Sequence, residues 1–133
     1  MAEFEAEQTK DRRPKLGIGV LILNELDEVI VSQRIDPNNA AFDKVWQFPG
    51  GHQEYGESFE YTAQREVLEE CGAHLPLQDI KFVTVMNVLY TEVGYHNVGI
   101  FMFCKVDKAS FSFENREPEK CTDWRWVPWA EYF

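Results

Sequence analysis

The chain has 133 residues, of which 44% are hydrophobic and 27% charged, and its formal net charge is −10. This length suits a single domain with one hydrophobic core. The acidic excess argues against binding to a nucleic acid polymer, because such binding needs a basic surface. There is no run of about 18 apolar residues, so we expect no membrane span.

The termini and the cysteines indicate a cytoplasmic protein. Residues 1–13 are charged and contain no apolar secretion signal, and we expect them to form a polar, flexible tail. Cys71, Cys104 and Cys121 are scattered and lack C-x-x-C spacing. Their pattern argues against a disulfide framework and against a structural zinc site, and it fits a reducing compartment.

Three strands are expected in the first part of the chain. Residues 16–23 form a nearly continuous apolar run, which predicts a strand buried on both faces. The turn-forming residues 24–27 follow, and residues 28–33 alternate in polarity as the second strand of a hairpin. A short strand at 46–48 should stop at the Pro-Gly-Gly sequence that starts at Pro49.

A helix is predicted over residues 58–71. Ser58 is a suitable N-cap, and Gly72 is placed to end the helix in the left-handed conformation. Helical spacing predicts one core-facing side that consists of Phe59, Ala63, Val67 and Leu68.

The rest of the chain is expected to add strands and the start of a helix. Two apolar segments, 81–89 and 98–106, predict strands joined by a turn through Gly94. After a polar loop, residues 124–127 are expected to form another short strand. Pro128 then suits the first turn of a helix.

Three glutamates of the predicted helix carry the chemical signal. Glu66, Glu69 and Glu70 are three and four residues apart, so their carboxylates project from about one face. Like charges at this spacing repel one another unless bound cations turn them into a set of ligands. Because no Cys or His pair lies nearby, the oxygen ligands indicate Mg²⁺, with Mn²⁺ as the alternative. An ordinary solvated helix face is the simplest competing interpretation.

Two neighbouring features support a metal and phosphate site. Arg65 can pair with Glu57 at the start of the helix and so hold the preceding loop in place. Gly50 and Gly51 have no Cβ and would allow the backbone to approach a metal or a phosphate closely. Cations held between carboxylates and phosphate oxygens neutralise a diphosphate and activate a water molecule, which predicts diphosphate hydrolysis.

The stretch from 51 to 73 resembles the Nudix box, G-x5-E-x7-R-E-U-x-E-E-x-G-U, where U is a bulky aliphatic residue. The strict positions that match are Gly51, Glu57, Arg65, Glu66, Glu69, Glu70 and Gly72. A chance match at seven positions is about one in a billion at a given start. Further likeness to the MutT-type nucleotide triphosphate diphosphatases lies in 46–51, in Tyr95-His96 and in the segment from Glu117 to Trp129.

The resemblance implies a fold, an activity and roles for the box residues. The implied fold is an α/β/α sandwich with a mixed β-sheet, which we expect to form a single domain over 14–133. The implied activity is Mg²⁺-dependent hydrolysis of a small nucleotide to a monophosphate and pyrophosphate. By this resemblance Glu66 and Glu70 bind the metal together with the Gly50 carbonyl, and Glu69 assists the metal or orients the water.

The same resemblance suggests residues that contact the substrate. Arg34 corresponds to an arginine that contacts phosphates, and Glu117 or Glu119 could supply another carboxylate. His96 is a further candidate, although a structural role is the more usual one for a lone histidine beside a turn. Relatives continue after the Trp-x-x-Trp segment into a helix that helps form the base pocket, so we expect the C-terminal helix to be cut short at Phe133. A homodimer is possible from family likeness alone.

Two other functions are compatible with the sequence. One is hydrolysis of a non-nucleotide diphosphate, such as a prenyl diphosphate, which would use the same metal chemistry with an apolar pocket. The other is a catalytically silent domain that only binds a nucleotide or a protein. The aromatic content of 14% does not distinguish a pocket for a base from a pocket for a prenyl chain.

Overall fold

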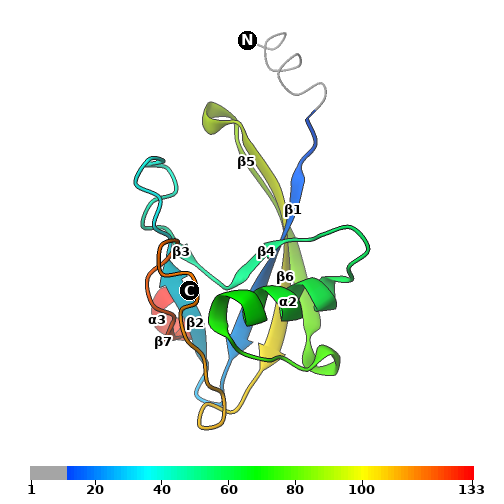
Figure 1. Ribbon diagram of the computed structural model, residues 1–133, viewed down its shortest axis with the longest axis vertical. Helices are drawn as coiled ribbons and strands as arrows, with labels where there is room; N and C mark the ends of the chain where they lie inside the picture. Colours follow the sequence, from blue (N-terminus) through cyan, green and yellow to red (C-terminus); the bar gives the residue numbers. More distant parts are fainter. Residues whose placement is uncertain (1–11) are drawn as a thin grey trace.

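A computed structural model describes residues 12–133, so most of the predicted tail 1–13 lies outside the described residues. The chain forms a seven-stranded mixed sheet, with helix α2 (Phe59–Cys71) packed on one face (Figure 1). A short helix, α3 (Trp129–Tyr132), follows the last strand. This arrangement confirms the predicted α/β class and the sandwich of helix and mixed sheet.

The sheet is built around strand β1. The strand order is β3 (Trp46–Gln47), β2 (Glu28–Gln33), β1 (Lys15–Leu23), β6 (Tyr95–Lys105) and β5 (Lys81–Tyr90). Strand β4 (Gly50–His52) also pairs with β1, and β7 (Arg125–Pro128) pairs with β2. The β1–β6 pair is parallel and the other strand pairs are antiparallel, which makes the sheet mixed. Short 3₁₀ turns, η1 (Leu77–Asp79) and η2 (Thr91–Val93), precede β5 and β6.

The two faces of strand β1 differ more in burial than the sequence predicts. Ile18, Val20 and Ile22 are buried in the main core, which includes residues of α2. The alternate positions, such as Gly19 and Leu21, are only half-buried on the opposite face. The prediction of a strand fully buried on both faces is therefore wrong for the face that α2 does not cover.

Strand β2 is buried on both faces, although its sequence alternates in polarity. Ile30 belongs to the core beneath α2, whereas Val29 and Val31 pack with Val127 of β7 in a second cluster. Even Ser32 is buried. On this face Val29 and Val31 pack with Val127 of the neighbouring strand and with Leu23 and Phe48, so side chains from other segments bury the face that local alternation assigned to solvent.

Strand β4 begins at Gly50, inside the Pro-Gly-Gly sequence that was expected only to end the strand at 46–48. Gly50 and Gly51 pair with Gly19 and Ile18 of β1 in antiparallel register. Glycine has low strand propensity, so local sequence does not indicate this pairing. The pairing fixes the glycine turn at the centre of the sheet, directly beside the helix that carries the acidic side chains.

Helix α2 has the predicted boundaries. The Ser58 hydroxyl accepts a hydrogen bond from the Tyr61 N–H, and Gly72 ends the helix with φ of 64°. Ala63 and Val67 are buried as predicted, but Leu68 is 45% exposed. The helix instead packs through a stripe in which the buried residues are Thr62, Ala63, Val67 and Cys71.

All three cysteines are buried and unpaired.

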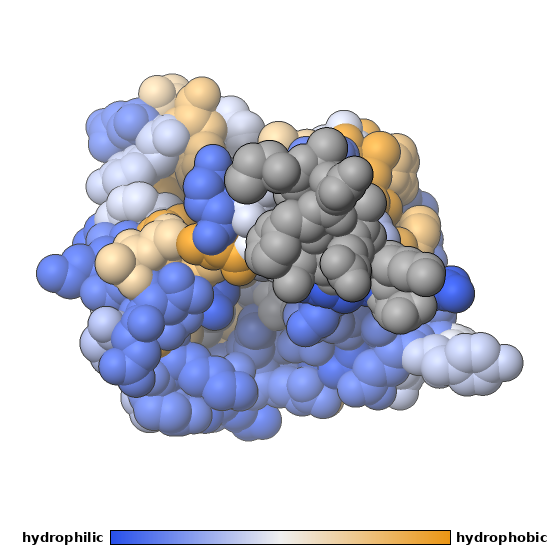
Figure 2. Space-filling view, turned by 90° about the horizontal axis from the view of Figure 1, so that it is seen from above, coloured by the Kyte–Doolittle hydropathy of each residue, from blue (hydrophilic) through white to orange (hydrophobic). Residues whose placement is uncertain are grey.

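The hairpin formed by β5 and β6 confirms the predicted pair of strands and the turn at Gly94, where φ is 64°. Strand β5 is an edge strand that leaves large apolar side chains in solvent, including Phe82, Val85 and Met86. Figure 2 views the hairpin end of the molecule and shows apolar patches set in a mainly hydrophilic surface. Over residues 12–133, no helix has the length and apolar character needed to cross a bilayer.

Candidate active site

An arginine–glutamate pair fastens the loop before α2 to the helix. Arg65 Nε donates to Glu57 Oε2 at 2.6 Å, and Arg65 Nη2 donates to Glu57 Oε1 at 3.0 Å. Arg65 Nη2 also donates to the His52 carbonyl at 3.1 Å. Hydrogen bonding from Arg65 lowers the pKa of Glu57 to about 2, so this carboxylate is ionised at neutral pH. The predicted pairing is present, and it braces the loop between β4 and the helix.

The carboxylates of Glu66 and Glu70 meet the glycine turn of β4. The Gly50 N–H donates to Glu70 Oε2 at 2.9 Å. A Cβ placed on Gly51 would collide with the carboxylate of Glu66, so that carboxylate keeps its position only while residue 51 is glycine. Two acidic groups from adjacent turns of α2 therefore lie against one piece of backbone.

Burial raises the pKa of both carboxylates. Desolvation is the main cause that raises the pKa of Glu66, although the guanidinium of Arg65 opposes it. Desolvation also raises the pKa of Glu70 to about 8, and repulsion from Glu66 and Glu117 adds to the increase. A bound cation would relieve both the desolvation and the repulsion.

The oxygen donors at this turn fit a hard divalent cation. Within the described part of the chain, no three Asp, Glu, His or Cys side chains are clustered as a ready-made cage. The turn instead brings the four carboxylate oxygens of Glu66 and Glu70 to the Gly50–Gly51 backbone. All are hard oxygen ligands that suit Mg²⁺ or Mn²⁺, which commonly keep several water ligands. Glu69 differs, because it is 56% exposed and pairs with Arg65 at 3.2 Å.

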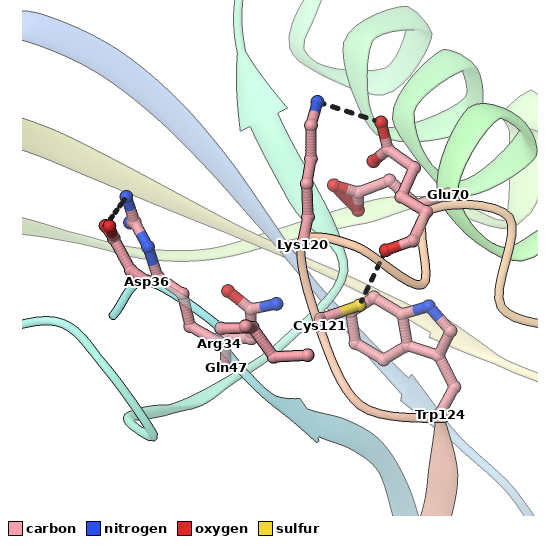
Figure 3. Close-up of a pocket in the computed structure, with 9 residues that line it drawn as sticks. Arg34, Asp36, Gln47, Glu70, Lys120, Cys121 and Trp124 are labelled. Atoms are coloured by element: carbon pink, nitrogen blue, oxygen red, sulfur yellow. Dashed lines mark hydrogen bonds and ion pairs between the residues drawn. The ribbon is translucent and has the colours of Figure 1, made fainter. Parts of the chain in front are cut away.

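A pocket of about 310 Å³ adjoins Glu70 (Figure 3). Residues that line it include Arg34, Glu70, Glu117, Lys120, Cys121 and Trp124. They come from the end of β2, from α2 and from the loop before β7, and an isolated bridge between Arg34 and Cys121 holds the first and last of these segments together. The pocket therefore contains the basic side chains of Arg34 and Lys120 together with Glu70 of the helix.

The candidate substrate residues do not all reach this pocket. Arg34 and Glu117 line it, whereas His96 and Glu119 are not among its lining residues. His96 Nε2 lies 2.7 Å from Asn87 Oδ1, within the β5–β6 hairpin that projects beyond α2 in Figure 1. Binding roles for His96 and Glu119 stay predictions. Lys120 lines the pocket and was not predicted, and its only signal in the sequence was its place directly after Glu117 to Glu119.

Comparison with known proteins identifies the family. A family model described as NUDIX domain matches residues 13–133. The chain belongs to this family. Nudix hydrolase 5 of Arabidopsis thaliana is 32% identical over 122 residues, which cover 89% of this chain and 37% of that protein. An RNA pyrophosphohydrolase of Roseobacter denitrificans is 41% identical over 63 residues, which cover 47% of this chain and 37% of that protein.

A solved structure agrees with the fold of this NUDIX domain. The crystal structure of a MutT NUDIX hydrolase from Burkholderia pseudomallei superposes with a TM-score of 0.74. It is 23% identical, and the match covers 88% of this chain and 84% of that one. The predicted Nudix resemblance and fold are thus confirmed. The NUDIX domain described here spans less than half the length of the two curated relatives named above.

Proposed function

We propose that this NUDIX domain hydrolyses a diphosphate linkage in a nucleoside triphosphate and releases a nucleoside monophosphate and pyrophosphate. The observation that carries the proposal is the convergence of two largely buried carboxylates, Glu66 and Glu70, on the Gly50–Gly51 turn. Burying two acids together is costly unless a cation joins them. The adjoining pocket supplies Arg34 as a partner for phosphate oxygens.

The proposed mechanism gives each side chain a defined task. Glu66 and Glu70 would hold Mg²⁺, which when bound would neutralise phosphate charge and increase the acidity of a water molecule. Arg34 binds a phosphate through its guanidinium. Glu69, at the exposed end of the carboxylate group, orients the attacking water or accepts its proton. The water oxygen bonds to one phosphorus while the bridging P–O bond breaks, so that one diphosphate yields two phosphate-bearing products.

The brace between Arg65 and Glu57 contributes by positioning. Arg65 contacts Glu57, Glu66 and Glu69, with hydrogen bonds of 2.6 to 3.2 Å. It thereby sets the directions of two box glutamates relative to the loop. Catalysis by charge neutralisation depends on such fixed geometry, because a misplaced ligand loses much of the benefit.

The test is a substrate panel with purified protein. The panel contains canonical, oxidised and thio-substituted nucleoside triphosphates, geranyl diphosphate and a 5′-triphosphorylated RNA, each with Mg²⁺. We expect pyrophosphate release from at least one nucleoside triphosphate, and a decrease of about 10²- to 10³-fold in the Glu70→Gln variant. Glu92→Gln, an exposed substitution in η2, is the matched control.

The panel separates the proposed function from its alternatives. Cleavage of geranyl diphosphate or of RNA without cleavage of a free nucleotide would show that the substrate belongs to that other class. If the wild type releases no more product than Glu70→Gln on every substrate, the domain is catalytically silent and the proposal fails.

A further inference from the structure

The pocket beside Glu70 contains two basic side chains, and each is paired with its own carboxylate. Arg34 Nη2 contacts Asp36 Oδ2 at 3.0 Å, and Lys120 Nζ contacts Glu117 Oε2 at 3.0 Å. Figure 3 shows Arg34 and Lys120 on separate segments, with Lys120 on the side where Glu70 lies. Lys120 is therefore the basic group at the acidic end of the pocket.

Lys120 acts as a counter-ion for the acidic group around it. Glu117 forms its hydrogen bond and raises its pKa, and Glu70 is among the other charges that do so. In return, the charge of Lys120 opposes the increase in the pKa of Glu70. A single positive charge thus offsets acidic groups that together would attract a divalent cation.

The ion pair between Lys120 and Glu117 is exposed enough to separate. The Lys120 side chain is 68% exposed and that of Glu117 is 30% exposed, and one contact joins them within a turn of loop. Such exposed pairs contribute little to stability, about 0.2 to 1 kcal/mol. The flexible four-carbon stem lets the ammonium group move several ångströms while the backbone stays fixed.

We propose that Lys120 exchanges partners during binding, from Glu117 to a phosphate oxygen of the substrate, when a divalent cation occupies the acidic end of the pocket. This rests on the metal and diphosphate chemistry of the proposed function. The cation repels the ammonium group and attracts Glu117. The released ammonium group still lines the same pocket as Arg34, so the two basic side chains bind the diphosphate together.

The exchange predicts effects of opposite sign when Lys120 is replaced by methionine. Lys120→Met removes a competing positive charge, so Mn²⁺ should bind about two- to fivefold more tightly to the substrate-free protein. The same change removes a phosphate contact, so a diphosphate should bind about tenfold more weakly in the presence of metal. An ordinary surface ion pair predicts neither shift.

Calorimetry on the full chain tests both effects without turnover. Mn²⁺ is titrated alone, and methylenediphosphonate, a non-hydrolysable diphosphate, is titrated at a fixed excess of free Mg²⁺. Lys108→Met is the matched control, because Lys108 pairs with Glu28 at 2.7 Å and does not line the pocket. Lys120→Arg keeps the charge and should stay within about twofold of the wild type in both titrations. Thermal melting confirms that each variant is folded.

Tighter Mn²⁺ binding together with weaker methylenediphosphonate binding in Lys120→Met supports the exchange. Shifts no larger than those of Lys108→Met overturn it, as does tighter metal binding with unchanged diphosphonate affinity. Weakening of both ligands overturns it too. Failure here is distinguishable from failure of the proposed function, because hydrolysis in the substrate panel does not require Lys120 to change partners.

Discussion

The site contains two ion pairs of opposite character. Arg65 and Glu57 have side chains that are 17% and 9% exposed, and two parallel hydrogen bonds join them. The side chains of Lys120 and Glu117 are 68% and 30% exposed, and a single ion pair joins them. The difference indicates that burial and a second hydrogen bond suit one pair to fixing geometry, whereas exposure suits the other to exchange, although each pair joins a glutamate to a basic side chain. The NUDIX box supplies the enclosed pair, and the loop before β7 supplies the solvent-exposed pair.

The largest expected effect comes from closing the space at the glycine turn. Gly51→Ala should lower metal affinity and kcat/KM by about 10- to 100-fold, because the added methyl group displaces the Glu66 carboxylate. Gly56→Ala is the control, since a Cβ there meets no atom within 4 Å and only its φ of 87° resists the change. That control should lower stability by about 1 kcal/mol and leave metal affinity intact. Equal metal affinity in Gly51→Ala and the wild type would contradict the placement of Glu66.

The two ion pairs should differ in their effect on stability. Arg65→Met should lower Tm by about 5–10 °C, because it leaves Glu57, Glu66 and the His52 carbonyl without their common donor. Lys120→Met should change Tm by less than about 2 °C. Melting curves of both variants, recorded in chelator, provide the comparison. Similar losses in the two variants would remove the distinction between a rigid and an exchangeable pair.

When a chelator removes divalent cations, Glu70 should make the free energy of unfolding fall as pH increases. Its pKa is raised to about 8 in the folded protein, from an ordinary value of 4.5. The folded state therefore favours the protonated acid, and its contribution is complete below pH 4.5 and lost as pH rises through 8. Urea unfolding at pH 5 and pH 8.5 should show a contribution of about 4 kcal/mol that Glu70→Gln removes. Saturating Mg²⁺ should reduce the slope, and a slope that Glu70→Gln does not change would contradict this account.

The smallest effects concern the helix that carries the site. Val67 is fully buried, whereas Leu68 is 45% exposed. Val67→Ala should cost about 2 kcal/mol of unfolding free energy. Leu68→Ala removes more atoms but should cost no more than about 0.5 kcal/mol. Urea unfolding of the pair measures the difference directly, and the reverse order would mean that α2 packs in another orientation.

Features encoded by local spacing could be predicted from the sequence. The cap at Ser58, the stop at Gly72 and the pairing of Arg65 with Glu57 all depend on residues within about two turns of α2. Leu68 was the exception within the helix. Apolar residues at 67 and 68 fit one stripe equally well, and only the direction from which the sheet approaches decides which of them is buried.

Features that depend on distant segments could not be predicted. Strand β4 forms because β1 lies beside it, and the second face of β2 is buried because Val127, Leu23 and Phe48 pack against it. In the same way, Lys120 reaches the pocket because backbone contacts, including the bridge between Arg34 and Cys121, join its loop to the segment after β2. The sequence identified the residues of the box but not the loop that completes the site.

The most direct test of the central claim is Mn²⁺ binding to the wild type and to Glu70→Gln, measured by calorimetry at pH 7.5. The account predicts saturable binding that weakens at least about tenfold in Glu70→Gln. Glu92→Gln, at the exposed end of the β5–β6 hairpin, should bind like the wild type. Equal Mn²⁺ affinity in all three proteins would show that the carboxylates beside the glycine turn do not hold the cation.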